Sequence, residues 1–231
     1  MPSSTPALGR ASRALGLAAL LPLACVREPL PEICPVVEEG DLVISELRGV
    51  SANASDTFGQ YIEVYNAGDH SVDLQGMVIR LRSSGGDELE VFVRESVPLA
   101  AGGYAVLGPG DPDDPPTWMD YALGWDISGG DPAPEDGGDP VFPKDLLRYD
   151  AAFIELEACE DLIDSVYYAA DDLPADGTLA CGNAEAPPSA ASNDAVEDGA
   201  CWCVDDLEAD PDYPLFGLGL PGTPGRANRC E

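Results

Sequence analysis

The chain has 231 residues, with 11 basic and 43 acidic side chains and a formal net charge of −32. Phosphate binding needs clustered Lys and Arg, whereas Lys144 is the only lysine, so we expect no nucleic-acid partner. The single histidine, His70, stands in the turn sequence Gly68-Asp-His-Ser71, which argues against a histidine-activated nucleophile. No nucleophile elbow, zinc-protease motif, P-loop or dinucleotide fingerprint appears, so the protein is predicted not to be an enzyme.

Residues 1–24 have the features of a secretory signal peptide. Arg10 and Arg13 precede an apolar run that ends at Ala24 and is too short to span a bilayer. The run leads into Leu21-Pro-Leu-Ala-Cys25, which is similar to the cleavage site of bacterial lipoproteins, where the cysteine is acylated. We therefore predict an exported protein of the cell envelope, anchored to the membrane by a lipid on Cys25. Cleavage elsewhere would make it a secreted protein.

Residues 25–40 are rich in proline and glutamate and are predicted to form a semi-rigid tether. Residues 41–231 then form one folded domain, because about 190 residues suffice for a single all-β core and no second composition boundary appears.

The cysteine count supports both export and the anchor. Seven cysteines leave one without a partner, and acylation of Cys25 accounts for it. The other six are disulfide candidates, because an exported protein folds in an oxidising compartment. They are Cys34, Cys159, Cys181, Cys201, Cys203 and Cys230. The sequence leaves their pairing open, although Cys34 with Cys230 is attractive because the ends of a domain often lie close together.

The neighbours Cys201 and Cys203 would point to the same side of a strand, so we expect them to have different partners. Trp202 between them is expected to cover an edge of the core. A zinc site is a weaker interpretation of these cysteines, because no histidine is nearby.

Short β-branched and aromatic runs bounded by Gly, Pro, Asp and Asn predict an all-β fold. The expected strands are residues 42–48, 60–66, 77–82, 88–94, 104–108, 151–157, 162–168 and 201–204. In the second of these, Ile62 and Val64 suit the core, and Glu63 lies on the opposite face between Tyr61 and Tyr65. We interpret Glu63 as an exposed or ion-paired group rather than a catalytic one.

One hairpin can be written in register from the sequence alone. Setting Leu81 opposite Leu89 produces a continuous apolar stripe on one face of the hairpin. The further apolar pairs are Ile79 with Val91 and Met77 with Val93. The opposite face then pairs Arg82 with Glu88, Arg80 with Glu90 and Val78 with Phe92. Arg80 and Arg82 are therefore predicted to be structural.

Residues 108–143 form a long acidic loop rich in proline and glycine. Long loops in compact domains are often functional, and Trp118, Tyr121 and Trp125 make this the candidate binding loop. The favoured alternative is that these aromatic side chains pack the loop onto the domain. The oxygen-rich stretches 111–114 and 131–139 lack EF-hand spacing, so no metal site or cofactor is predicted, with calcium as the alternative.

Six stretches of sequence occur in a fixed order between residues 41 and 229. They are Leu42-Val-Ile-Ser-Glu-Leu47, Gly59-Gln-Tyr-Ile-Glu-Val-Tyr-Asn66, Val72-Asp-Leu-Gln-Gly76, Leu99-Ala-Ala-Gly-Gly-Tyr-Ala-Val-Leu107, Leu162-Ile-Asp-Ser-Val-Tyr-Tyr168 and Gly222-Thr-Pro-Gly-Arg-Ala-Asn228. In that order they resemble the lamin-tail domain family, of the bacterial exported or lipoprotein type. The resemblance implies an immunoglobulin-like β-sandwich, here with a long acidic loop insertion. It differs from the family pattern at Met77, where a tryptophan is frequent, and we expect that difference to soften one site in the core.

The resemblance implies a non-catalytic binding or structural module of the cell envelope, because bacterial lamin-tail domains occur in exported and surface proteins. We expect its acidic loop to meet a protein or glycan partner. Two alternatives are kept: a calcium-dependent binding domain, and a hydrolase that uses paired carboxylates.

Overall fold

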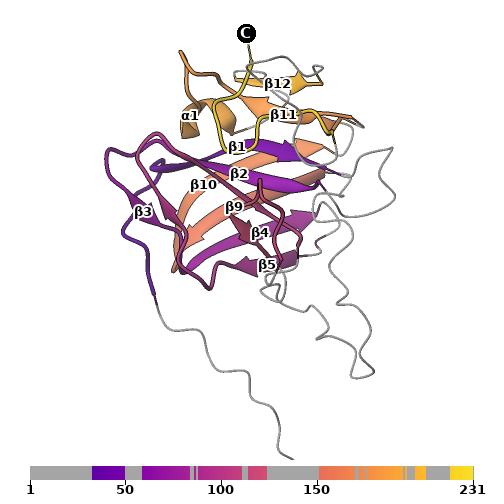
Figure 1. Cartoon of the computed structure of the whole chain (residues 1–231). Coiled ribbons are helices and arrows are strands. Elements are labelled where there is room, and N and C mark those ends of the chain that lie inside the picture. Colours follow the sequence, from indigo (N-terminus) through magenta and orange to yellow (C-terminus); the bar gives the residue numbers. More distant parts are fainter. Residues whose placement is uncertain are drawn as a thin grey trace, which may run out of the picture.

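The computed structural model describes residues 33–49, 59–83, 86, 88–110, 114–123, 151–169, 172–174, 176–194, 196, 201–206 and 219–230. These residues form a mostly β structure with one short helix (Figure 1). The strands are β1 (Leu42–Arg48), β2 (Tyr61–Asn66), β3 (Val72–Asp73), β4 (Met77–Ser83), β5 (Glu88–Phe92), β6 (Pro98–Leu99), β7 (Tyr104–Gly108), β8 (Tyr121–Ala122), β9 (Ala151–Ala158), β10 (Asp161–Ala169), β11 (Thr178–Cys181) and β12 (Trp202–Asp205), and the helix is α1 (Ala190–Asn193).

The strands form three sheets. A six-stranded sheet has the order β12-β11-β1-β2-β7-β8, in which only the β7–β8 pair is parallel among the described pairs. A four-stranded antiparallel sheet has the order β10-β9-β4-β5, and β3 pairs with β6 in a two-stranded sheet. In Figure 1 the strands β1 and β2 lie above β9 and β4. One apolar cluster takes buried side chains from both larger sheets, including Ile44, Ile62, Ile79 and Ile154.

The hairpin of β4 and β5 has the register that the sequence predicts. Leu81 lies opposite Leu89 and Ile79 opposite Val91, and the Val93 amide donates to the Met77 carbonyl. The stripe is buried at Leu81 and Val91, both of which have no exposed surface. On the other face Arg80 opposes Glu90 and Arg82 opposes Glu88, as expected. Both arginines bind neighbouring carboxylates there, which confirms their structural role.

Every strand expected from the sequence is present, and no end differs from its expected position by more than two residues. The sequence patterns missed four short strands, β3, β6, β8 and β11, and the helix α1. The first three have only two residues each, too few for an alternating pattern to be visible. The fourth, β11, has all four side chains buried, so its sequence does not alternate between polar and apolar residues.

The stretch 33–40, which the sequence assigns to the tether, packs against the domain. Cys34 forms a disulfide with Cys159 in the turn between β9 and β10, and the Gly40 amide donates to the Ile163 carbonyl. The Ile33 carbonyl oxygen lies so close to Gly76 that a Cβ there would be 2.0 Å from it. Only glycine allows this approach, and Gly76 also has a positive φ of 96°. Residues 1–32, with the predicted signal peptide and Cys25, lie outside the described residues.

A bulge in β1 decides which side chains face away from the core. The register of β1 on β2 shifts between Ile44 and Glu46, so Ser45 is an extra residue in the strand. Ile44 and Leu47 belong to the core cluster, whereas Ser45 and Glu46 both bind groups on the opposite face. All seven residues of β1 are buried, because each face of the strand is covered.

Met77 lies beside a small apolar void in the core. The void has a volume of about 10 Å³ and is enclosed by side chains that include Leu42, Leu74 and Leu156. Its lining offers no polar partner for a water molecule, and apolar cavities of this size stay dry. The void lies at the site where the sequence led us to expect softer packing.

Candidate functional site

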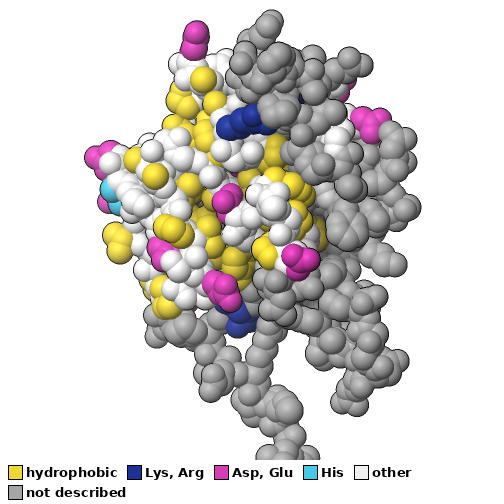
Figure 2. Space-filling view, viewed as in Figure 1, with side chains coloured by type: hydrophobic (Ala, Val, Ile, Leu, Met, Phe, Trp, Pro, Cys, Tyr) yellow, Lys and Arg dark blue, Asp and Glu magenta, His cyan; other side chains and the backbone are white. Residues whose placement is uncertain are grey.

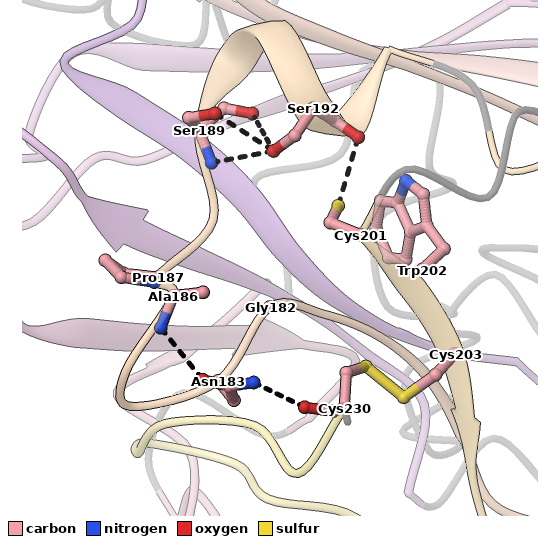
Figure 3. Close-up of a pocket in the computed structure, with 10 residues that line it drawn as sticks. All are labelled: Gly182, Asn183, Ala186, Pro187, Ser189, Ser192, Cys201, Trp202, Cys203 and Cys230. Atoms are coloured by element: carbon pink, nitrogen blue, oxygen red, sulfur yellow. Dashed lines mark hydrogen bonds between the residues drawn. A yellow bond between two sulfur atoms is a disulfide. The ribbon is translucent and has the colours of Figure 1, made fainter.

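The structure contains a pocket of about 380 Å³ that is framed by three segments (Figure 3). One is the loop after β11, the second is the first turn of α1, and the third is β12 with the end of the chain. Ten residues line the pocket: Gly182, Asn183, Ala186, Pro187, Ser189, Ser192, Cys201, Trp202, Cys203 and Cys230. None of these side chains is charged, although the chain as a whole is strongly acidic.

Local sequence chemistry builds the loop side of the pocket. A Cβ on Gly182 would lie 2.7 Å from the Ala186 carbonyl oxygen, and its φ is 73°, so this tight turn requires glycine. The Asn183 side chain accepts hydrogen bonds from the amides of Glu185 and Ala186 and donates to the Cys230 carbonyl. This asparagine therefore joins the loop to the end of the chain.

The helical side is fixed by a capping box. The Ser192 hydroxyl accepts from the Ser189 amide at 3.2 Å, and the two hydroxyls lie 2.9 Å apart. The Trp202 indole donates to the Asn193 carbonyl at 3.0 Å, which attaches β12 to α1. Trp202 is only 8% exposed, which confirms that it covers an edge of the core.

Two disulfides hold the remaining wall. Cys201 pairs with Cys181 and Cys203 pairs with Cys230, so the two neighbours have different partners as expected. The attractive pairing of Cys34 with Cys230 is wrong, because Cys34 bonds Cys159 instead. One end of the domain is fastened to the turn between β9 and β10 and the other to β12, rather than to each other. The three disulfides indicate an oxidising, extracytoplasmic environment.

A second notable site is the carboxylate pair, which we define as Glu46 of β1 and Glu63 of β2. The two residues are direct partners in the β1–β2 register, and neither has any exposed surface. The interpretation of Glu63 as an exposed or ion-paired group is therefore wrong. The Ser45 hydroxyl donates to Glu63 Oε1 at 2.7 Å, and the Thr178 hydroxyl donates to Glu46 Oε1.

The pair is covered by residues 219–230, which we call the C-terminal strap. The Thr223 amide donates to Glu46 Oε1 at 3.1 Å, and the Gly225 amide donates to Glu63 Oε2 at 2.7 Å. Asn228 adds hydrogen bonds from its side-chain nitrogen to the carbonyls of Ser45 and Cys181. Both carboxylates thus hold the backbone of one segment.

Burial decides the ionisation of this cluster. It raises the pKa of Glu46 to about 7, against lowering by the hydrogen bonds from Thr178 and Thr223. Burial also raises the pKa of Glu63 well above its ordinary value, and the charge of Glu46 raises it further. The pKa of Tyr61 is likewise raised by burial and by Glu46, and burial lowers the pKa of Arg48.

Sequence reasoning missed the carboxylate pair for a specific reason. Strict alternation along β1 would place Ser45 and Glu46 on opposite faces, and only the bulge puts both on the covered face. The signal in the sequence was indirect: Glu46, Glu63 and residues 222–228 of the strap lie in three of the six stretches that the sequence analysis singled out.

The described part of the candidate binding loop packs against the domain. Tyr121 is 6% exposed and its hydroxyl accepts from the Arg94 amide, while Trp118 packs on Tyr61 with ring centroids 5.8 Å apart. Trp125 lies outside the described residues, so binding by this loop stays a prediction. On the face in Figure 2 the described acidic side chains are scattered singly among apolar ones.

His70 is exposed and lies 3.2 Å from Asp69, its neighbour in the turn. Within the described ranges no cluster of three or more His, Cys, Asp or Glu side chains could hold a metal ion. The stretch 131–139 and most of 111–114 are outside those ranges, so calcium binding there stays a prediction. No helix of the described part of the chain is long and apolar enough to cross a membrane.

No family model matches the chain, and no curated protein is similar enough in sequence to count as a match.

Proposed function

We propose that this protein is a non-catalytic binding or structural module of the cell envelope, an immunoglobulin-like β-sandwich of the lamin-tail type that is anchored by a lipid on Cys25. The observation that carries the proposal is the set of three disulfides. One fastens the stretch before β1 to the turn between β9 and β10, and two fasten β12 to β11 and to the end of the chain. Disulfides of this kind stabilise a single folded conformation in an oxidising compartment outside the cytoplasm.

The arrangement of the strands supports the sandwich part of the proposal. Two sheets, one mixed and one antiparallel, contribute to one apolar cluster, which is how a sandwich buries its inner faces. Three of the stretches that resemble the family also meet in space: β1 pairs with β2, and the strap binds the carboxylate of each. Residues far apart in the sequence thus form one interlocked unit.

The neutral pocket is the described feature best suited to receive part of a partner. Disulfides and a capping box fix the walls of the pocket, so binding should cost little conformational entropy. Its lining is uncharged, which suits an uncharged group of a glycan or protein better than an anion. We propose that partners bind at this pocket or at the loop 108–143.

A pair of matched variants separates these two surfaces. Ala186 lines the pocket and is exposed, whereas the exposed Ala184 nearby does not line it. In a binding screen against isolated envelope glycans and envelope proteins, Ala186→Trp should abolish a pocket interaction that Ala184→Trp leaves intact. Binding that survives Ala186→Trp but is lost with Trp125→Ala would assign the partner to the loop instead.

The anchor is tested by mass spectrometry of the unreduced protein purified from its own envelope. The proposal expects a mature chain that begins at acylated Cys25 and retains three disulfides. A Cys25→Ser protein should leave the detergent phase and become water-soluble. Identical partition of the Cys25→Ser and original proteins into detergent would remove the lipid anchor from the proposal.

The calcium alternative predicts that millimolar calcium raises the melting temperature above that of a chelator control, because a ligand that binds the folded state stabilises it. The hydrolase alternative has a concrete candidate in the Glu46–Glu63 pair. That pair has no exposed surface, and its oxygens accept hydrogen bonds from the strap, so it offers a substrate no access while the strap is closed. These contacts favour a structural role for the pair.

A further inference from the structure

The two edges of the four-stranded sheet differ in what covers them. At the β10 edge, the Gly40 amide donates to the Ile163 carbonyl, and the Tyr167 backbone bonds to the Asp194 carbonyl and the Val196 amide. At the other edge, β5 pairs with β4 and with no further strand of the described part of the chain. Figure 1 shows β5 below β4 as the last strand of this sheet. Within the described residues, no backbone hydrogen bond reaches its free side.

The register identifies the backbone groups that face this open edge. Residues of an antiparallel strand bond alternately to the neighbour on one side and to the neighbour on the other. The Val93 amide donates to the Met77 carbonyl, so every second residue counted back from Val93 bonds to β4. Glu88, Glu90 and Phe92 lie between those positions. Their amides and carbonyls therefore point away from β4 and are the groups that an added strand would bind.

The charges on the outer face of the sheet alternate in sign from strand to strand. They are Glu155 and Glu157 on β9, Arg80 and Arg82 on β4, and Glu88 and Glu90 on β5. Two arginines therefore meet four glutamates, and the side chains of Glu88 and Glu90 stay 41% and 30% exposed. Because opposite charges stabilise cross-strand pairs, the residues that suit the next positions beyond Glu88 and Glu90 are basic.

The other positions of β5 favour apolar neighbours. Val91 is fully buried, and the half-buried Leu89 packs against the core cluster at the margin of the sheet. On the outer face, the Arg94 guanidinium lies over the Phe92 ring, 5.9 Å from its centroid. A second cation beside Phe92 would be repelled by Arg94. The complement of β5 is thus apolar opposite Leu89, Val91 and Phe92.

We propose that the open edge of β5 binds an extended basic peptide, which adds to the sheet as an antiparallel strand. The peptide carries basic residues opposite Glu88 and Glu90 and apolar residues at the other positions. Its source is an exposed basic segment of another envelope protein. The proposal goes beyond the function proposed above and uses neither the lipid anchor nor the neutral pocket. In Figure 1, β5 lies at the opposite end of the molecule from β11, β12 and α1, which frame that pocket.

A second copy of this chain is a poor occupant of the same edge. Pairing β5 with another β5 would place glutamates beside glutamates, and each chain has a formal net charge of −32. Charged residues on edge strands commonly prevent such self-association. The glutamates of β5 therefore make the edge selective for a partner of opposite charge.

An end-blocked synthetic peptide with the core Val-Val-Lys-Val-Lys, titrated into the intact, oxidised protein, tests the proposal. At saturation, hydrogen exchange of the Glu88, Glu90 and Phe92 amides should slow at least about tenfold. The Ile79 amide of β4 serves as the internal reference and should keep its rate. A peptide with glutamate in place of lysine should not bind. Absence of binding up to about 1 mM, or binding without slower exchange at β5, would overturn the proposal.

Backbone methylation of the peptide separates strand pairing from general attraction between charges. Methyl groups on the two lysine amides remove donors that face β5 and should abolish binding. The same number of methyl groups on the two valines opposite Leu89 and Val91 point away from β5 and should leave binding intact. Equal binding of the two methylated peptides would show that the peptide is held by its charge alone, which contradicts strand addition.

Matched charge variants of the protein test the role of the edge glutamates. Glu88→Gln combined with Glu90→Gln should weaken binding on the order of fivefold at about 0.15 M salt. Glu155→Gln combined with Glu157→Gln removes the same charge from β9, two strands from the edge, and should change binding by less than about twofold. Equal losses in the two variants contradict the proposal. If either variant does not fold, the methylated peptides decide with the original protein.

Discussion

Two faces of this protein carry opposed charged residues, and the two arrangements have different physical origins. On the outer face of the four-stranded sheet, Arg80 lies among Glu88, Glu90 and Glu157, each close enough for an ion pair. On the outer face of β1 and β2, two glutamates oppose each other beneath the strap. The first network is partly open to water and alternates in sign, whereas the second is enclosed and combines like charges.

The difference between the two faces shows that a cross-strand pairing of charged residues does not by itself predict how much each charge contributes to stability. Partly exposed ion pairs add little to stability because water and salt screen them. Substitutions of enclosed polar groups change the free energy of unfolding strongly, because a buried group that loses its hydrogen-bond partner cannot bind water instead. We therefore expect substitutions beneath the strap to matter far more than substitutions on the other face.

The largest effects should come from the disulfides that fasten each sheet. Removing Cys34–Cys159, which closes a separation of 125 residues, should lower the free energy of unfolding by roughly 5 kcal/mol. Removing Cys203–Cys230, with a separation of 27, should lower it by roughly 3.5 kcal/mol. Urea denaturation of the two double Cys→Ala variants measures both values. Hydrogen exchange of the strap should increase relative to β4 only in the second variant, and equal increases would contradict the proposed role of that bond.

Asp205→Asn tests the enclosed side of the comparison. Asp205 binds the Arg229 guanidinium, and the two side chains are 1% and 8% exposed. Removing the carboxylate charge leaves a buried cation, so we expect a loss of about 4 kcal/mol in the free energy of unfolding. Glu88→Gln on the open face is the control, and its melting temperature should match that of the original protein within error. Similar losses in the two variants would remove the distinction between the faces.

Arg80→Met tests the open face at its centre. The variant leaves three neighbouring carboxylates without their shared cation, so we expect a loss of about 1 kcal/mol near neutral pH. Denaturation at about 0.1 M and about 1 M salt should show that the loss shrinks as screening increases. The loss in Asp205→Asn should change little with salt, because that pair is enclosed. A salt-independent loss in Arg80→Met would indicate that the network is not screened by solvent.

The smallest expected effect is a pH dependence of stability at Asp73. The pKa of this residue is lowered, whereas the pKa values of Glu46 and Glu63 are raised. The Ser96 hydroxyl, with the amides of Gln75 and Val97, holds the pKa of the exposed Asp73 below its ordinary value of 3.8. Its stabilising contribution is present above that value and is lost as the pH falls through the lowered pKa. Asp73→Asn should therefore lower the melting temperature slightly at neutral pH and leave it unchanged near pH 2. A larger difference at acidic pH would contradict this assignment.

The sequence by itself determined the features that depend on local alternation and on counting. Period-two alternation in residues 77–93 was enough to set the β4–β5 register, because a slip of one residue would bury Arg80 and expose Ile79. The placement of Cys201 and Cys203 two residues apart was enough to assign them different partners.

Tertiary structure decided the features that depend on distant segments. The partner of Cys34 depends on which turn its segment crosses, and no local pattern encodes that path. The environment of Glu63 depends on a bulge in another strand and on a strap that is 162 residues away along the chain. The same glutamate would lie in water on a bare sheet face. Only the folded chain encloses it, because the covering backbone comes from the opposite end of the domain.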